Sequence, residues 1–179
     1  MICYLDMDGV LTDIMTAASM WHGVANPYDE HPEELAGVYN FHGFLGRSRD
    51  EFWGTLPQDF WANIPPTPEA QQIVQIVEEH FNKIWLLTSP ENHPGCVPGK
   101  QDWCRRHFPQ YVDRIIPESR KWKYAQKDTV LIDDYHINVE KFKKNGGHGI
   151  LFPRLWNPLH SQRHAPIDFL LVELERILA

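Results

Sequence analysis

The sequence has few cysteines, no long apolar run and no basic stretch, and each absence excludes a class of protein. Its three cysteines are odd in number and lack the spacing of metal ligands, so we expect neither a disulfide framework nor a zinc site. No apolar run reaches the length of about 18 residues that a membrane-spanning helix needs, so we expect no membrane partner. The formal net charge of −7 has no compensating basic run, which argues against an extended nucleic-acid partner.

The chain is long enough for one full hydrophobic core. Its 179 residues are 42% hydrophobic, which suffices for a single core with a smaller appended unit. An apolar strand begins directly after Met1, so no signal or transit peptide is expected. The sequence therefore predicts a cytoplasmic protein and leaves its oligomeric state open.

The first apolar run, Ile2–Leu5, ends in two carboxylates, Asp6 and Asp8, which Gly9 follows. Side chains alternate across a strand, so the two acids share a face only while the backbone stays extended, and the glycine then lets the chain turn away. Two close carboxylates repel each other unless a cation or a proton lies between them, and oxygen-only ligands favour Mg²⁺ over Zn²⁺. Alone, the motif is also compatible with a strand that ends in a solvated, capped turn.

Polar side chains also follow two later apolar runs, and lysines lie between these runs. The residues are Thr88 and Ser89 after 83–87, Lys121 and Lys123, and Asp133 and Asp134 after 129–132. Because the carboxyl ends of parallel strands meet at one edge of a sheet, we expect these groups to converge with the N-terminal acids. Metal-binding acids, lysines and hydroxyls form a set that handles phosphate, since cations offset its charge and hydroxyls donate to its oxygens.

Strands and helices alternate along the chain. Apolar periodicity predicts strands at 2–6, 83–88, 113–116, 129–133 and 149–152, and helices at 69–81, 99–107, 121–126, 137–144 and 167–178. This order predicts an α/β fold with a mostly parallel sheet and helices on both faces. Residues 16–66 interrupt the alternation with a segment rich in aromatic residues, histidine, proline and glycine.

The order of these motifs resembles the haloacid dehalogenase (HAD) phosphohydrolase superfamily. In that pattern an Asp-x-Asp-Gly-Val motif, a hydrophobic-Thr-Ser motif, a lysine and a hydrophobic-Asp-Asp motif follow one another, and the match covers residues 1 to about 153. Within the superfamily, Phe60–Pro66, Cys96–Trp103 and Arg114–Ile116 are similar to the 5′(3′)-deoxyribonucleotidase family.

The resemblance implies two structural units. Residues 1–15 and 67–179 would form a Rossmann-like core, and the inserted residues 16–66 would form a small helical cap. In this superfamily an insertion at that point is a cap that closes over the active site, and closure excludes water and commits the substrate.

The resemblance also implies a role for each motif. Asp6 would be the nucleophile that forms an aspartyl-phosphate, and Asp8 would be the general acid and base. Thr88 would hold a phosphoryl oxygen, with Ser89 as a second donor to the substrate. A lysine would neutralise both the phosphate and Asp6.

Magnesium is the cofactor that the resemblance implies. Mg²⁺ would bind the carboxylate of Asp6, the backbone carbonyl of Asp8 and one of the paired acids at the end of the fourth motif. We favour Asp134 as the direct ligand and Asp133 as the residue that orients it, while Asn138 would orient a metal-bound water.

The identity of the phosphate lysine stays open between two residues. Counting forward from Arg114–Ile116 selects Lys121, and counting back from Asp133 selects Lys123. We favour Lys121 because it begins a predicted short helix, whose first backbone amides point toward phosphate. Lys123 remains the second candidate for a substrate contact.

Aromatic residues of the predicted cap bear on the substrate. Phe52, Trp53 and Trp61 either form the cap's own core or contact the substrate by stacking on a nucleobase, since every base has a π-face. Deoxyribonucleotidases keep an aromatic residue at the position that matches Ile14, so this chain departs from the family at one position of the base pocket.

The motifs together predict a Mg²⁺-dependent phosphomonoesterase that acts on a small-molecule substrate. Nucleoside monophosphates are the expected substrates, deoxyribonucleotides first. A phosphatase for another small phosphometabolite or for a polynucleotide end is the alternative within enzymes. A binding module on a HAD core that has lost its activity is the alternative outside them, and the intact set of acids, threonine and lysine argues against it.

Overall fold

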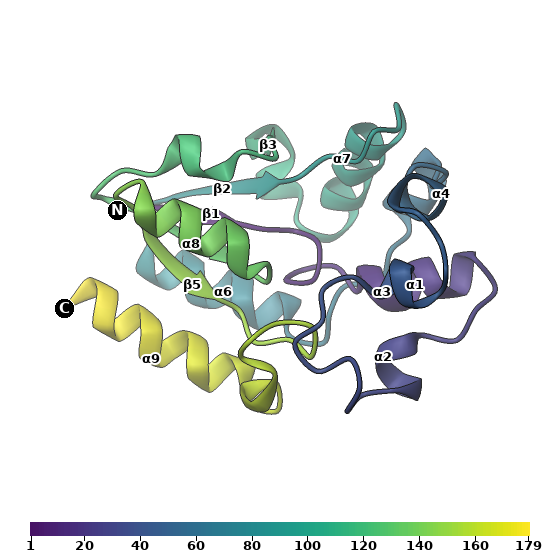
Figure 1. Ribbon diagram of the computed structural model, residues 1–179. Coiled ribbons are helices and arrows are strands. Elements are labelled where there is room, and N and C mark those ends of the chain that lie inside the picture. Colours follow the sequence, from purple (N-terminus) through teal and green to yellow (C-terminus); the bar gives the residue numbers. More distant parts are fainter.

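A parallel sheet forms the centre of the molecule. The computed structural model describes residues 1–179, except for the side chain of Phe41. The strands are β1 (Ile2–Leu5), β2 (Lys83–Thr88), β3 (Ile115–Pro117), β4 (Thr129–Asp133) and β5 (His148–Leu151). Within the described residues they pair in the order β3-β2-β1-β4-β5, all parallel (Figure 1). Cys3 and Leu5 of the central strand β1 are fully buried, as expected for a strand covered on both faces.

Helices cover both faces of this sheet. The helices of the core are α6 (Ala70–His80), α7 (Cys96–His107), α8 (His136–Lys144) and α9 (Pro166–Leu178), with short 3₁₀ helices η1 (Pro109–Arg114), η2 (Lys121–Tyr124) and η3 (His160–Gln162). On one face, α6 and α9 contribute Ile73, Val77 and Leu170 to the main hydrophobic core. On the other, α8 and η2 pack around Phe142 and Tyr4. The predicted α/β fold is confirmed.

The inserted segment, residues 16–66, lies at the carboxyl ends of the strands. Its helices are α1 (Ile14–Trp21), which begins two residues earlier, α2 (Pro27–Glu30), α3 (Phe41–Phe44), α4 (Arg49–Trp53) and α5 (Gln58–Ala62). In Figure 1, α1 to α4 lie beyond the strand tips, and both chain termini lie at the opposite end. The two ends of the segment lie side by side, because Asp13 N donates to Pro65 O at 2.8 Å and Thr67 N donates to Leu11 O at 2.9 Å.

Three predicted elements differ from those observed by more than one residue. Residues 109–114 form η1, so the predicted strand 113–116 begins only at Ile115. The predicted helix 121–126 is instead the single 3₁₀ turn η2, because Lys121 turns into the core and the chain must reach β4 at Thr129. α7 also begins at Cys96 rather than at 99, since Pro98 lies within the first turn, where a helix tolerates proline. Among the described residues, no helix is both long and apolar enough to cross a membrane.

Replacing Gly99 by alanine should destabilise the protein. A Cβ atom at this position would lie 2.5 Å from both Gln58 O and Trp61 Cβ, because α7 contacts α5 through its backbone. Overpacking of this kind costs about 1–3 kcal/mol of unfolding free energy, which urea denaturation would measure. Arg105→Ala on the exposed side of α7 is the control and should change stability by less than about 1 kcal/mol. Equal effects of both variants would contradict the close helix contact.

Candidate active site

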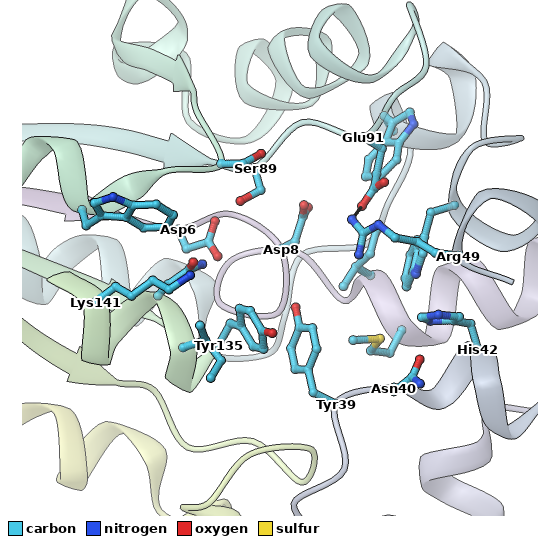
Figure 2. Close-up of a pocket in the computed structure, with 18 residues that line it drawn as sticks. Asp6, Asp8, Tyr39, Asn40, His42, Arg49, Ser89, Glu91, Tyr135 and Lys141 are labelled. Carbon is cyan, nitrogen blue, oxygen red and sulfur yellow. Dashed lines mark hydrogen bonds and ion pairs between the residues drawn. The ribbon is translucent and has the colours of Figure 1, made fainter.

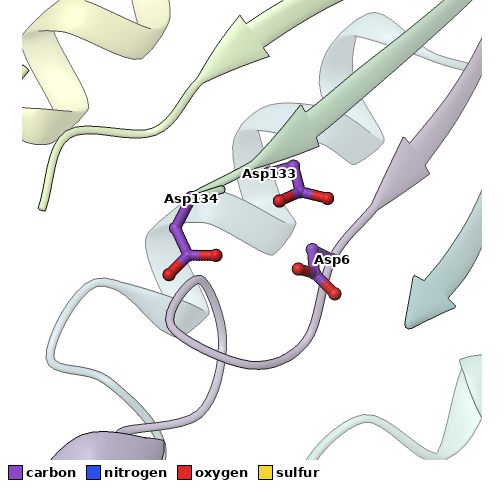
Figure 3. A group of neighbouring side chains, drawn as sticks. All are labelled: Asp6, Asp133 and Asp134. Atoms are coloured by element: carbon purple, nitrogen blue, oxygen red, sulfur yellow. The ribbon is translucent and has the colours of Figure 1, made fainter. Parts of the chain in front are cut away.

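Three aspartates meet where β1 and β4 end. The pairing of Leu5 with Ile132 places the next residues of these strands, Asp6 and Asp133, side by side. Asp134 completes a group whose ligand oxygens lie within 4.8 Å of one another, all three residues being buried (Figure 3). The strand order reverses between β1 and β4, and open α/β sheets bind ligands at such a switch point.

Lys121 neutralises part of this buried charge. Its Nζ lies 2.7 Å from Asp6 Oδ1 and 2.7 Å from Asp133 Oδ2, and its side chain is fully buried. Burial alone would lower the pKa of Lys121, but the carboxylates of Asp133 and Asp6 outweigh it and raise this pKa above its usual range. Lys123, by contrast, is exposed and donates to Glu118 Oε2 at 2.6 Å. Of the two lysines that the spacing left open, Lys121 is the one beside the aspartates.

The two acids of the fourth motif have different partners. Asp133 accepts from the Tyr135 amide at 2.8 Å and from Lys121 and Asn138 at 2.7 and 3.0 Å, so both its oxygens are engaged. Asp134 Oδ2 accepts from the Trp156 indole at 2.6 Å, whereas Oδ1 is buried with no hydrogen-bond partner among the described residues. A buried oxygen without a donor, within an all-oxygen cluster, fits a hard cation such as Mg²⁺.

Negative charge at this cluster exceeds what Lys121 offsets. The pKa of Asp6 is raised to about 7 as the net result of burial, which raises it most, of Lys121, which lowers it, and of Asp133 and Asp8, which raise it. Burial, followed by repulsion from Asp133 and Asp6, raises the pKa of Asp134 well above its usual range. A divalent cation would relieve both effects, because an opposite charge stabilises the ionised carboxylates.

Asp8 lies beside a second buried lysine, which has no assigned role in the sequence analysis. Lys100 Nζ donates to Asp8 Oδ2 at 2.5 Å, to Thr88 Oγ1 at 2.6 Å and to Ser89 O at 3.2 Å, with its side chain 2% exposed. Thr12 Oγ1 donates to the other oxygen of Asp8 at 3.2 Å. Burial would lower the pKa of Lys100, but Asp8, Cys96 and Asp6 together outweigh this and raise it.

The spacing of buried residues on α7 is a signal that identifies Lys100. Cys96, Trp103 and Cys104 lie four residues before, three after and four after it, and all three are fully buried. Positions at these intervals share one face of a helix, so a lysine among them points into the protein. A buried lysine needs charged or polar partners, which here are Asp8, Thr88 and Ser89 at the carboxyl edge of the sheet.

A pocket of about 540 Å³ opens above the carboxylates, between the core and the inserted segment. Asp6, Asp8 and Ser89 are among the residues that line it. Figure 2 shows Tyr39 of the insert beside Tyr135 of the core, with ring centroids 4.2 Å apart. Arg49 of α4 also forms an ion pair with Glu91, which follows β2, and these two residues line the pocket as well (Figure 2). The insert therefore covers the polar strand ends.

The candidate aromatic residues occupy two different places. Trp53 and Trp61 line the pocket, although they are only 8% and 1% exposed. Phe52 is fully buried and packs against His22 and Trp53, with ring centroids 4.3 and 4.8 Å apart. Ile14, where the family resemblance implies an aromatic residue, lies in the pocket wall.

Comparison with known proteins identifies a family. Residues 1–165 match the family model "5' nucleotidase, deoxy (Pyrimidine), cytosolic type C protein". Two curated relatives, each a 5′(3′)-deoxyribonucleotidase, come from Bacillus subtilis (strain 168) and Bacillus phage SPbeta. Each is 25% identical over 154 residues, which is 83% of this chain and 82% of the relative. A solved HAD family enzyme from Bacteroides thetaiotaomicron, in complex with magnesium and inorganic phosphate, aligns with a TM-score of 0.45 and 14% identity over 86% of this chain and 93% of that one.

Without a metal, the buried Asp6 should make stability fall as the pH rises. The pKa of Asp6 is about 7 in the folded protein against a usual value of 3.8, so between these values the folded state binds more protons than the unfolded state. The free energy of unfolding then decreases with rising pH. Melting temperatures in a chelator from pH 5 to 7 test this. Histidines titrate in the same window, so the quantity compared is the difference between wild type and Asp6→Asn.

The expected result is that wild type loses stability relative to Asp6→Asn as the pH rises from 5 to 7. In Asp6→Asn the side chain at this position is neutral at every pH, so the penalty of ionising a buried carboxyl is absent. A difference that stays constant, or that changes in the opposite direction, would show that Asp6 ionises as easily in the folded protein as in the unfolded chain.

Proposed function

Since this chain belongs to the deoxy (pyrimidine) cytosolic type C family of 5′-nucleotidases, and is therefore a phosphomonoester hydrolase, we propose that its substrates are deoxyribonucleoside monophosphates. The observation that carries the proposal is the convergence of Asp6, Asp8, Thr88 and two buried lysines beside a pocket that Asp6, Asp8, Trp53 and Trp61 line. Its volume of about 540 Å³ is in the range of small-molecule sites.

In the proposed reaction Asp6 is the nucleophile. Lys121 and the Met7 amide both bind Asp6 Oδ1, at 2.7 and 2.8 Å, which leaves Oδ2 to attack phosphorus. The bond from phosphorus to the ester oxygen breaks, and an aspartyl-phosphate forms on Asp6. Water then attacks this intermediate, and inorganic phosphate leaves with the Asp6 carboxylate restored.

Asp8 moves the protons in both steps. It donates a proton to the departing ester oxygen and later accepts one from the attacking water. Lys100 stabilises the carboxylate that Asp8 becomes after the first transfer, since an adjacent ammonium favours the charged form. Thr88 Oγ1 already accepts from Lys100, so its own hydrogen is available to a phosphoryl oxygen.

Mg²⁺ is the proposed cofactor. The residues that would hold it are Asp6 through its carboxylate, Asp8 through its backbone carbonyl and Asp134 through Oδ1, with Asp133 fixed behind them by Lys121 and Asn138. When bound, the ion offsets the negative charge of the phosphoryl group during transfer.

The inserted residues 16–66 are the proposed cap over a core of residues 1–15 and 67–179. The Arg49–Glu91 ion pair and the contact between Tyr39 and Tyr135 both join this segment to the core at the pocket. A closed cap excludes water, which strengthens the electrostatic interactions inside. Trp53 and Trp61 would then supply the surface against which a nucleobase packs.

Phosphate release from a panel of substrates tests the function. The panel contains all ribo- and deoxyribonucleoside 5′- and 3′-monophosphates and a set of sugar phosphates, each assayed with Mg²⁺ and with a chelator. We expect Mg²⁺-dependent release that favours deoxynucleotides by at least about tenfold, roughly the discrimination that one group in a pocket provides. Asp6→Asn should lower kcat by at least about 1,000-fold, since removing a nucleophile leaves only the residual catalysis of binding. A preference for sugar phosphates would exclude the nucleotidase specificity and keep the phosphatase chemistry.

Comparing the two lysine variants tests which lysine acts on phosphate. Lys121→Met should lower kcat at least about 100-fold, because a buried cation beside the nucleophile stabilises the developing charge. Lys123→Met, a matched change on the same turn, should stay within about threefold of wild type, since Lys123 binds Glu118 at the surface. Circular dichroism confirms that each variant folds. An equal loss of activity in Lys123→Met would show that the assignment to Lys121 is wrong.

A further inference from the structure

The loop after β5 holds Asp134 from two directions. Trp156 Nε1 donates to Asp134 Oδ2 at 2.6 Å. Asn157 Nδ2 donates to the backbone oxygen of Asp134 at 2.9 Å and to Phe152 O at 2.8 Å, and Asn157 is fully buried. The side chain and the backbone of Asp134 are thus both fixed by residues that lie more than twenty positions later in the chain.

The hydrogen bond from the Trp156 indole to Asp134 determines which carboxylate oxygen of Asp134 faces the aspartate cluster. The last torsion of an aspartate side chain is broad and roughly two-fold, so a free carboxylate rotates easily. Trp156 engages Oδ2 and leaves Oδ1 buried without a hydrogen-bond partner among the described residues. The indole N–H of Trp156 can only donate a hydrogen bond, and it has no lone pair to offer a cation. Trp156 can therefore orient Asp134 but cannot itself be a metal ligand.

The indole is itself held between the insert and the loop after β1. The rings of Trp156 and Tyr28 of α2 have centroids 5.2 Å apart, and Gly37 N of the insert donates to Leu155 O at 2.8 Å. On the other side, a Cβ atom at Gly9 would lie 2.1 Å from Asp134 Oδ2 and 3.2 Å from Trp156 Cζ2. Gly9, with its φ of +75°, therefore leaves the space that the indole and the carboxylate share.

We propose that Trp156 is a positioning residue of the metal site, whose indole N–H holds Asp134 with Oδ1 directed at the cation. This inference rests on the proposed function, because it concerns the Mg²⁺ site of that function. Hydrogen bonds that orient a metal ligand contribute about 10- to 100-fold to metal affinity. Removal of the N–H should therefore weaken Mg²⁺ binding and leave the chemical step, once the site is saturated, almost intact.

Trp156→Phe tests the proposal, because it removes the N–H donor and keeps a ring against Tyr28. Calorimetric titration with MgCl₂ alone should show a Kd about 10- to 100-fold higher than in wild type. At saturating Mg²⁺, kcat should stay within about threefold of wild type while the Mg²⁺ concentration for half-maximal rate rises by the same factor as Kd. Trp85→Phe on β2 is the matched control, since Trp85 packs in the smaller core under α8, and it should leave Kd unchanged.

The outcomes separate this inference from the proposed function. If Trp156→Phe binds Mg²⁺ like wild type while Asp134→Asn does not, the metal site stands and the role of Trp156 is wrong. If wild type binds no Mg²⁺ and releases phosphate in a chelator, the proposed Mg²⁺ site and the role of Trp156 are both wrong, whereas the phosphatase activity stands.

Should Trp156→Phe fail to fold, the indole N–H resonances of wild type, followed by NMR during titration with MgCl₂, give the answer. One of them must shift in proportion to Mg²⁺ saturation, and unchanged indole resonances would overturn the proposal.

Discussion

Buried negative charge is the constraint on which the arrangement at the carboxyl edge of the sheet depends. Asp6, Asp133 and Asp134 lie together almost without solvent, where carboxylates ionise only if cations are close. Lys121 contacts Asp133 and one oxygen of Asp6, so one ammonium faces three acids, and the pKa values of Asp6 and Asp134 are raised accordingly. A further cation, such as the proposed Mg²⁺, would offset the remaining negative charge, and a bound phosphate, itself an anion, would add to it.

The contact between α5 and α7 links this electrostatic site to its cover. Gly99 allows the two helices to approach, and the next residue, Lys100, reaches Asp8 and Thr88. Trp61 of α5 lies over the same ammonium, with its ring centroid 5.1 Å from Lys100 Nζ. One packing interaction thus buries the second lysine and places an aromatic wall above it. Excluding water from the Lys100–Asp8 ion pair strengthens the attraction between the two charges, and it makes any unpaired charge at this place more costly.

The sequence was informative where chemistry and local pattern coincide, and uninformative where contacts depend on tertiary packing. The strands that end at Asp6, Thr88 and Asp133 follow from short apolar runs, and their parallel pairing brings the polar ends together. Spacing did not separate Lys121 from Lys123, because only burial distinguishes them. The contacts of the insert, such as Arg49–Glu91 and Tyr39–Tyr135, join residues far apart in the sequence within a segment that has no apolar period, so no local signal predicts them.

The attachment of the insert determines how the proposed cap relates to catalysis. Both of its ends pair beside the loop after β1, where Thr12 forms a bridge with Pro66 and its hydroxyl donates to Asp8 at 3.2 Å. A displacement of the insert at this point would move Thr12, which holds Asp8, the proposed acid–base catalyst. At the Arg49–Glu91 edge of the pocket, the insert is joined to the core by an ion pair and, nearby, by the Tyr39–Tyr135 ring contact, which break at much lower cost than the hydrophobic core shared by the insert and the sheet. The proposed cap would therefore separate first on the Arg49–Glu91 side, while the attached side keeps Asp8 in position.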